Sequence, residues 1–333
     1  MVDLSSTAST DTQAFSFEAC LEAKRERIQT KAGPIEIACM GEGAPLLSIH
    51  GGPGGCDQGL VLAMPFVRAG FRVISVSRPG YLGTPLESGI SFDDQADLLA
   101  SLLDALGFDS LPVVGASAGG PVAYLLAQRH SKRVQALVVI DGVTQSYSKA
   151  EQLSVLEEAI FLSQPGLWVM DWLGRHFPAS VVKGLLTTES TLREDALTER
   201  VQEVVQDPEK LSFVRVMMRT MTEQFKQRQQ GLRNDLSKLA AITKLELDAI
   251  RCPTLIIHGD ADADVPADDA RWAHQQIKQS RLHTIPGGSH LAFWIAPGAA
   301  EAQELAIAMA GDHRRPANHP GVPSTQHEVH GVL

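Results

Sequence analysis

Residues 111–121 read LPVVGASAGGP, and this stretch decides the fold. The apolar run over residues 111–114 predicts a buried strand, and a helix is expected to begin at Ala118. Between them stands a Gly-x-Ser-x-Gly pattern, whose small residues allow a sharp turn that presents the Ser117 hydroxyl at the carboxyl edge of a sheet. The following helix N-terminus offers free N–H groups. The pattern predicts a serine nucleophile; the alternative is a plain small-residue turn.

Alternating strand and helix patterns extend from this stretch in both directions. Apolar residues recur at steps of four and three from Phe92 to Leu106, which marks one face of a helix. Strands rich in Val, Leu and Ile that alternate with helices indicate an α/β protein with a mostly parallel sheet covered on both faces. The predicted strands cover residues 25–31, 35–40, 45–49, 72–76, 111–114, 134–140, 254–258 and 281–285. Further helices are expected over residues 118–128, 268–277 and 299–310.

The alternation is interrupted once, by a segment whose apolar residues recur only at helical spacing. We interpret this segment as an all-helical cap inserted into the α/β domain. The expected units are a flexible N-terminus (residues 1–20), an α/β core (21–144 and 251–311), the cap (145–250) and a flexible C-terminal tail (312–333). The histidines of the proline-rich tail have spacings that fix no metal-ligand geometry, so no metal site is expected there.

The composition excludes several classes of protein. Hydrophobic residues make up 44% and charged residues 20% of 333, which is ordinary for a globular protein. A formal net charge of −10 disfavours binding to nucleic acid. The four cysteines lack the paired spacing of a disulfide framework or a zinc site. No stretch is long and apolar enough to span a membrane, and the N-terminus lacks the features of a secretory signal, so we expect a cytoplasmic location.

A glycine loop follows the strand predicted over residues 45–49. Residues 50–55 read HGGPGG. A serine hydrolase needs N–H donors where an oxyanion forms, and glycine lets a backbone approach closely because it lacks a Cβ atom. We assign the N–H groups of Gly52 and Ala118 to an oxyanion hole, with Gly51 as the competing donor. A phosphate-binding loop is the alternative, but no Lys-Ser/Thr pair follows and the Gly-x-Gly-x-x-Gly spacing is absent.

Two further strand ends carry carboxylates and a histidine. Residues 253–266 read PTLIIHGDADADVP, and residues 285–290 read IPGGSH. Serine is a weak nucleophile at neutral pH, so it needs a base, and the base needs a group that orients it. Ser117, Asp262 and His290 occur in the chain order expected for a triad on this architecture. Each motif lies at the carboxyl end of a predicted strand, where sites in open α/β sheets form.

With these motifs in register, the chain resembles α/β-hydrolase-fold enzymes with a helical cap over about residues 25–310. The resemblance rests on residues 50–55, residues 77–81, Ser117, Asp262 and His290. In that family the acid lies three residues after the strand-end glycine, which points to Asp262 rather than to Asp260 or Asp264. Some relatives place the acid after the preceding strand, where this chain has Asp141.

The resemblance also narrows the expected reaction. The glycine loop is similar to that of capped proline iminopeptidases, but those usually carry an aromatic residue where this chain has Ala118. Haloalkane dehalogenases and epoxide hydrolases use an aspartate nucleophile. We expect a serine hydrolase that cleaves a carboxylic ester of a small, largely apolar substrate, with no cofactor and no metal. The alternatives are hydrolysis of an amide, lactone, thioester or carbon–carbon bond with the same triad, a haloperoxidase side activity and, remotely, a non-catalytic ligand receptor.

Several other side chains have expected roles. Aromatic residues and methionines of the cap either line the substrate pocket or pack against each other. Our candidates for the lining are Phe161, Trp168, Trp172, Met218 and Met221. A peptidase would need cap carboxylates such as Glu189 to hold an ammonium group. We expect His50 to brace the glycine loop by hydrogen bonding. Arg78 is expected to pair with a carboxylate or with loop carbonyls near the site, with substrate binding as the alternative. Asn234 or Asp235 is expected to cap a helix, with a substrate contact as the alternative.

Overall fold

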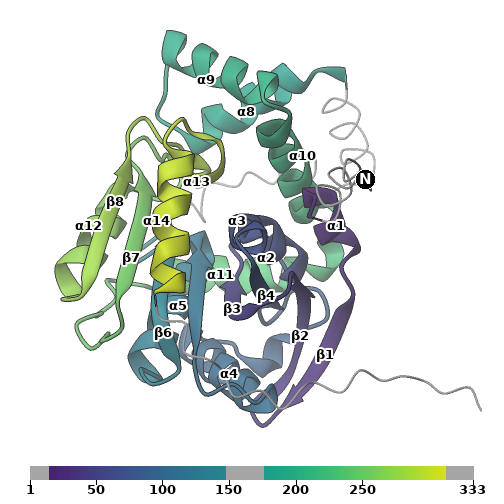
Figure 1. Ribbon diagram of the computed structural model, residues 1–333, viewed down its shortest axis with the longest axis vertical. Helices are drawn as coiled ribbons and strands as arrows, with labels where there is room; N and C mark the ends of the chain where they lie inside the picture. Colours follow the sequence, from purple (N-terminus) through teal and green to yellow (C-terminus); the bar gives the residue numbers. More distant parts are fainter. Residues whose placement is uncertain (1–14, 148–175, 313–333) are drawn as a thin grey trace, which may run out of the picture.

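The computed structural model describes residues 15–147 and 176–312. They form an eight-stranded sheet with the order β1-β2-β4-β3-β5-β6-β7-β8, flanked by helices (Figure 1). β2 pairs antiparallel with β1 and β4, and the other neighbouring pairs are parallel. The strands are β1 (Arg25–Thr30), β2 (Gly33–Met40), β3 (Ala44–Ile49), β4 (Phe71–Ser77), β5 (Leu111–Ala116), β6 (Val134–Ile140), β7 (Thr254–Gly259) and β8 (Ser280–Ile285). Every strand expected from the sequence is therefore present.

Helices cover both faces of this sheet. α4, α5 and α12 pack on one face, and α2, α3, α13 and α14 pack on the other. The α/β domain contains the helices α1 (Phe17–Glu22), α2 (Cys56–Leu62), α3 (Met64–Arg68), α4 (Phe92–Ala105), α5 (Gly120–Arg129), α12 (Ala267–Gln276), α13 (Ala292–Ile295) and α14 (Ala299–Gly311). It also contains 3-10 turns at Leu86–Ser88 and Ser117–Gly119. No helix within the described ranges is long and apolar enough to cross a bilayer.

The central strands explain why both faces are covered. In β6, Leu137 and Val139 belong to the core on the α4 and α5 face, whereas Val138 and Ile140 belong to the core on the opposite face. Successive side chains of a strand point to opposite faces, so a strand that is apolar at every position must be buried on both sides. The parallel strands end at a common edge of the sheet, and the sequence motifs follow those ends.

The segment between β6 and β7 is helical in its described part. It contains α8 (Pro178–Glu189), α9 (Glu194–Gln206), α10 (Pro208–Thr222), a 3-10 turn η4 (Phe225–Gln227) and α11 (Gln229–Ala240). Figure 1 shows α8, α9 and α10 above the sheet, whereas α11 lies lower, near the strands. An inserted helical segment is thus present, and the limits of the cap at residues 145–250 remain a prediction.

The prediction of a flexible N-terminus is wrong from Ser16 onward. Residues 1–20 were expected to be flexible, yet Ser16 caps α1 by accepting a hydrogen bond from the Ala19 N–H (3.2 Å), and Phe17 and Cys20 are buried. Phe17 packs edge-on against Phe213 of α10, with 5.6 Å between the ring centroids. Contact with a distant part of the chain orders α1, which the local sequence does not reveal.

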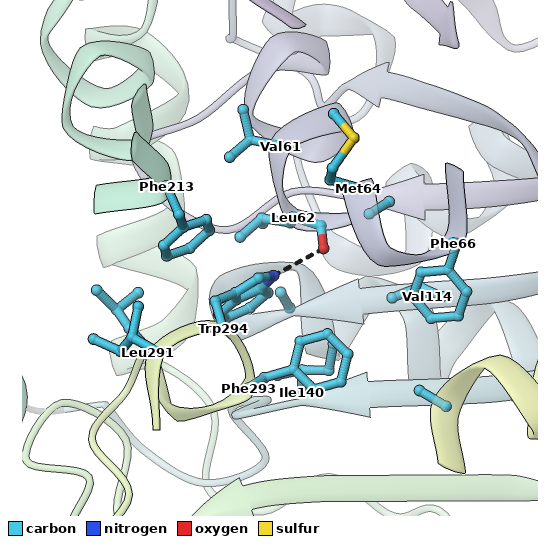
Figure 2. Packing of buried hydrophobic residues seen from close by; sticks show 14 of the residues in the cluster. Val61, Leu62, Met64, Phe66, Val114, Ile140, Phe213, Leu291, Phe293 and Trp294 are labelled. Atoms are coloured by element: carbon cyan, nitrogen blue, oxygen red, sulfur yellow. Dashed lines mark hydrogen bonds between the residues drawn. The ribbon is translucent and has the colours of Figure 1, made fainter. Parts of the chain in front are cut away.

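An aromatic cluster joins α10 to the α/β domain (Figure 2). The Trp294 ring of α13 stacks on Phe213 with 5.3 Å between centroids and an interplanar angle of 8°. The indole N–H donates a hydrogen bond to the Leu62 carbonyl at 3.0 Å, so this buried ring has its polar edge satisfied. Phe293 meets Trp294 edge-on at 5.1 Å. The cluster therefore fixes α10 against the edge of the sheet that carries the site.

Candidate active site

Ser117 lies in a strained turn between β5 and α5. Its φ is +51°, in the left-handed region that residues with a side chain rarely adopt. The flanking glycines are required by close approaches. A Cβ atom on Gly115 would lie 2.6 Å from Ala123 Cβ, and one on Gly119 would lie 2.4 Å from the His50 carbonyl oxygen. The Gly-x-Ser-x-Gly pattern thus encodes a turn that packing holds in a strained conformation.

The glycine loop of residues 50–55 lies directly against this turn. A Cβ atom on Gly51 would lie 3.1 Å from Ser117 Cβ, and one on Gly52 would lie 3.7 Å from Ala118 Cβ. Ala118 lies in the 3-10 turn that leads into α5, so its N–H belongs to the N-terminal end of a helix, where N–H groups lack helical partners. Gly52 and Ala118, the residues expected to form the oxyanion hole, are therefore neighbours beside Ser117, as is the competing donor Gly51.

His50 braces this loop, as the sequence predicted. The Arg78 backbone N–H donates to His50 Nε2 at 2.9 Å, so Nδ1 carries the ring proton and donates it to the Gly51 carbonyl at 2.5 Å. Burial, together with the positive charge of Arg78, lowers the pKa of His50 well below its ordinary value. His50 therefore stays neutral and acts as a fixed link between the loop and the end of β4.

Asp262 and His290 are directly hydrogen-bonded. His290 Nδ1 lies 2.7 Å from Asp262 Oδ2, and Asp262 Oδ1 accepts hydrogen bonds from the Asp264 and Val265 N–H groups at 2.7 and 2.9 Å. Neutral His290 consequently has its Nε2 as the acceptor. Ser117 and His290 line one cavity, and no hydrogen bond joins their side chains among the described residues. Proton transfer between them therefore requires this pair to approach in the substrate complex.

Carboxylates surround His290 and control its charge. Burial opposes the charged form, but Asp262 above all, with Asp264 and Asp141, raises the pKa of His290 well above its ordinary value. Asp264 Oδ2 lies 3.7 Å from His290 Nε2, and Asp264 Oδ1 accepts a hydrogen bond from the Tyr147 hydroxyl at 2.6 Å. Burial also opposes charge on Asp262, yet the charge of His290 lowers the pKa of Asp262. The pair is therefore ionised in the free protein until the pH exceeds the raised pKa of His290.

A further carboxylate, Asp141, and a second histidine, His258, lie close to Asp262. His258 Nε2 is 2.9 Å from the Val265 carbonyl oxygen and 3.4 Å from Asp262 Oδ2, and His258 Nδ1 is 3.8 Å from Asp141 Oδ1. Burial, reinforced by the charge of Asp262, raises the pKa of Asp141 to about 7. In the described structure Asp262 is hydrogen-bonded to the base, whereas the ion-pair contact of Asp141 is with His258.

The group Asp141, His258 and Asp262 also has the residue types of a metal site. Atoms able to bind a metal lie within 4.8 Å of one another in this group. Both Asp262 oxygens, however, accept hydrogen bonds, and His258 Nε2 faces a carbonyl oxygen. Within the described residues, Asp141 Oδ2 and His258 Nδ1 are the group's buried atoms without a hydrogen-bond partner, which is fewer ligands than a typical metal site has. The arrangement favours a chain of charged groups rather than a metal centre.

The end of α8 joins the two loops that carry Asp262 and His290. The Glu189 carbonyl oxygen accepts hydrogen bonds from the His290 N–H at 3.0 Å and the Ala263 N–H at 3.3 Å. Thr191 N–H donates to the Ala261 carbonyl at 2.8 Å. The inserted helices therefore contact the acid–base loops through backbone groups.

Two adjoining cavities meet at Ser117. The first has a volume of about 80 Å³ and mostly apolar walls that include Leu62, Leu185, Met217, Met218 and Trp294. The second has a volume of about 360 Å³, and its walls are also mostly apolar. Met221 and Glu189 line both cavities. Two of the predicted lining residues therefore border the site, Met218 in the first cavity and Met221 in both. Phe161, Trp168 and Trp172 lie outside the described residues.

Asp235 has a place that the sequence pattern did not predict. It lies within α11 rather than at its start, so the expected capping role is wrong. Its Oδ1 accepts a hydrogen bond from Arg78 Nη1 at 2.9 Å, and both residues are buried. Asn234 does not cap the helix either, because its side-chain amide donates to the Ile90 carbonyl at 2.9 Å. No local pattern reveals the Arg78–Asp235 pair, since its members are 157 positions apart.

Comparison with known proteins decides the family. Residues 44–297 match the family described as alpha/beta hydrolase fold. The chain belongs to this family. A solved structure of an alpha/beta hydrolase fold protein from Nakamurella multipartita has 36% sequence identity and a TM-score of 0.81, and the match covers 86% of this hydrolase and 99% of that chain.

Other proteins similar to this α/β hydrolase include an uncharacterized hydrolase, a semialdehyde hydrolase and an esterase. It is 27% identical over 291 residues to the uncharacterized hydrolase YcgS of Bacillus subtilis (strain 168), covering 86% of this chain and 98% of that protein. It is 28% identical over 255 residues to the 2-hydroxymuconate semialdehyde hydrolase of Pseudomonas sp. (strain CF600), covering 75% and 81%. A thermophilic esterase from Thermogutta terrifontis has the same fold, with 22% identity, a TM-score of 0.61 and coverage of 88% and 100%.

Proposed function

We propose that this α/β hydrolase cleaves a carboxylic ester of a small, largely apolar substrate through Ser117, His290, Asp262 and an acyl-enzyme. Neutral His290 accepts the Ser117 hydroxyl proton at Nε2 while Oγ attacks the acyl carbon. Asp262 keeps Nδ1 protonated and stabilises the imidazolium. His290 then donates the proton to the leaving alcohol, and a water molecule activated by the same base releases the acid and regenerates Ser117.

The proposed oxyanion donors are the N–H groups of Gly52 and Ala118, with Gly51 as the alternative to Gly52. They lie around Ser117 on two different loops, so they can approach an oxyanion from two sides. Removal of one donor of this kind typically lowers turnover by about 10²- to 10³-fold.

The observation that carries this proposal is the 2.7 Å contact between His290 Nδ1 and Asp262 Oδ2 beside a strained serine turn. This contact orients a base toward the cavity that Ser117 also lines. The apolar walls of the first cavity favour an apolar acyl or alcohol group, and we propose Met218 and Met221 as substrate contacts.

Hydrolysis of p-nitrophenyl esters with acyl chains of increasing length tests the proposal. The wild type should turn over the esters, and Ser117→Ala should not. Ser237→Ala, which changes a serine of α11 outside the residues lining either cavity, serves as the matched control and should behave as the wild type. Wild-type turnover that persists in Ser117→Ala would contradict the proposed nucleophile.

An amide-cleaving peptidase is a second candidate, and the position of Glu189 favours it. Glu189 and Asp264 line both cavities next to Ser117, and carboxylates suit a substrate with a free amino group. A proline p-nitroanilide distinguishes the two candidates. Cleavage of the anilide in preference to every ester would replace the esterase proposal with the peptidase.

Carbon–carbon bond hydrolysis is a third candidate, favoured by the similarity to the 2-hydroxymuconate semialdehyde hydrolase. The carboxylates on the cavity walls disfavour a substrate that carries a carboxylate of its own. Turnover of 2-hydroxymuconate semialdehyde faster than that of every p-nitrophenyl ester would overturn this ranking.

A further inference from the structure

Two buried arginines contact the glycine loop of residues 50–55, and each has its ionic partner across the boundary between the α/β domain and the inserted helices. Arg78 follows β4 and pairs with Asp235 of α11. Arg228, between η4 and α11, pairs with Asp57 of α2. The exposed fractions of Arg78 and Arg228 are 1% and 0%. In one ion pair the arginine belongs to the α/β domain, and in the other the arginine belongs to the inserted helices.

Arg78 holds the first part of the loop. Its Nε donates to the His50 carbonyl at 3.1 Å, and its Nη2 lies 3.4 Å from the Gly51 carbonyl oxygen. The two Nη atoms bind the two carboxylate oxygens of Asp235, and the Tyr81 hydroxyl donates to Asp235 Oδ2 at 2.6 Å. A bidentate pair of this kind fixes the guanidinium plane, so Asp235 determines where Arg78 presents its remaining donors.

Arg228 holds the other end of the loop. Its Nη1 donates to the Gly54 carbonyl at 2.7 Å and to Asp57 Oδ1 at 3.0 Å, and its Nη2 lies 2.6 Å from Asp57 Oδ2. Its Nε donates to the Glu223 carbonyl at 2.9 Å. The carbonyl groups of His50, Gly51 and Gly54 are therefore all bound by arginines that depend on the inserted helices.

Backbone contacts keep the start of α11 in place beside this loop. The Gly231 N–H donates to the Gly80 carbonyl, and the Leu82 N–H donates to the Gln227 carbonyl, each at 2.8 Å. A Cβ atom on Gly80 would lie 2.6 Å from the Gly231 nitrogen. α11 is therefore packed backbone to backbone against the segment that carries Arg78, and Asp235 is held at a defined position.

The orientation of one peptide group links these bridges to catalysis. The Gly51 carbonyl oxygen accepts from His50 Nδ1 and faces Arg78 Nη2. In a trans peptide the C=O and the following N–H point in opposite directions, so the Gly52 N–H points away from Arg78 and His50. Hydrogen bonds to the Gly51 carbonyl therefore fix the direction in which the Gly52 N–H, the proposed oxyanion donor, points.

We propose that Asp235 and Arg228 are positioning residues for the oxyanion hole, and this inference rests on the proposed function. Asp235 acts through Arg78 on the Gly51–Gly52 peptide, and Arg228 acts directly on Gly54. The inserted helices thereby help to build the site that stabilises the transition state, in addition to covering the substrate. Displacement of a catalytic group by about 1 Å can lower the rate by about 10²-fold, so loosening of this loop reduces turnover.

Asp235→Asn tests the inference. It should lower kcat for the best p-nitrophenyl ester by about 10- to 100-fold and change KM by less than about threefold, because oxyanion stabilisation acts in the transition state. The pH midpoint of kcat/KM should stay at the wild-type value, since the carboxylates that raise the pKa of His290 are Asp262, Asp264 and Asp141. Amide hydrogen exchange of residues 50–55 should become faster. Asp97→Asn, in an exposed ion pair with Arg129, is the control and should change none of these quantities.

The results separate this inference from the proposed function. Unchanged kcat, or unchanged exchange of residues 50–55, in folded Asp235→Asn would overturn the positioning role. A wild type without ester turnover would overturn the proposed function, and the exchange rates would then still decide whether Asp235 holds the loop. If Asp235→Asn does not fold, Tyr81→Phe removes only the hydroxyl that binds Asp235 and should give the same kcat-specific loss at a smaller size.

Discussion

The two sides of Ser117 are held by networks built from different groups. On the acid–base side, the carboxylates of Asp262, Asp264 and Asp141 surround His290. On the oxyanion side, Arg78 and Arg228 bind the carbonyl groups of the glycine loop, whose residues 50–55 carry no acidic side chain. The charged groups nearest His290 follow the ends of β6 and β7, whereas each arginine on the other side needs a partner across the domain boundary.

This difference separates two tasks of a hydrolase site. The acid–base side sets the charge of a group that must gain and lose a proton, and its charged side chains come from the motifs that follow β6, β7 and β8. The oxyanion side must keep neutral N–H groups at fixed positions, which depends on the direction of peptide groups in a glycine-rich loop. Changes on the first side should therefore alter pH dependence, and changes on the second should alter kcat at every pH.

The largest effect is expected at Ser117, where the two sides meet. Ser117→Ala removes the nucleophile, so kcat for the best p-nitrophenyl ester should fall on the order of 10⁶-fold. Steady-state assays with enzyme at high concentration measure the remaining activity. A loss below about 10²-fold would mean that another group attacks the substrate and that Ser117 is not the nucleophile served by the two sides.

The next effect distinguishes Asp262 from Asp141 on the acid–base side. Asp262→Asn should lower kcat by about 10⁴-fold, because an asparagine favours the wrong tautomer of His290. Asp141→Asn should lower kcat by less than about tenfold, since the ion-pair contact of Asp141 is with His258, whereas Asp262 is hydrogen-bonded to the base. Paired kcat measurements at one pH provide the test. Equal losses in the two variants would contradict the assignment of Asp262 as the acid.

A smaller effect is expected in the pH profile. The base must be neutral to accept a proton, and the surrounding carboxylates raise the pKa of His290, so kcat/KM should rise with pH through neutrality and level off above that raised pKa. Asp264→Asn removes a carboxylate 3.7 Å from His290 Nε2, so the rise should move to lower pH. Initial rates from about pH 5 to 10 measure this shift. A flat wild-type profile, or a rise moved to higher pH in Asp264→Asn, would contradict the account of this side.

The smallest effect concerns the hydrogen bond that joins α13 to α2 within the aromatic cluster, rather than the chemistry. Trp294→Phe leaves a buried carbonyl of Leu62 without its donor, which should lower the free energy of unfolding by about 1 to 3 kcal/mol. Urea denaturation measures this change. Leu305→Ala, at a 38% exposed leucine of α14, is the control and should change stability by less than about 0.5 kcal/mol. Equal stability of Trp294→Phe and wild type would show that this bond does not contribute to the stability of the protein.

Much of the fold follows from local sequence because its signals are local. The apolar strands alternate with helices of regular period, and Ser117, Asp262 and His290 each follow a strand within a short Gly-containing motif. Strand ends of a parallel sheet meet at one edge, so the sequence alone predicts that these motifs converge.

The rest of the site depends on contacts between distant residues. Asp235 is an ordinary acidic residue in mid-helix, and Arg228 pairs with Asp57 across 171 positions, so neither has a local signature. The ordering of α1 likewise depends on Phe213. A buried ion pair can be inferred from sequence only when the topology of the inserted helices is known, because solvent exposure, not residue type, distinguishes it from a surface charge.

The most direct test of the account is the mass of the enzyme during turnover. Wild type and His290→Gln are mixed with a p-nitrophenyl ester, quenched in acid within milliseconds to seconds and digested for mass spectrometry of the peptide that contains Ser117. We predict an acyl adduct on Ser117 in the wild type and no detectable adduct in His290→Gln on this timescale, because the hydroxyl then lacks its base. Rapid release of p-nitrophenol by the wild type with the acyl group on another residue, or on none, would contradict the account.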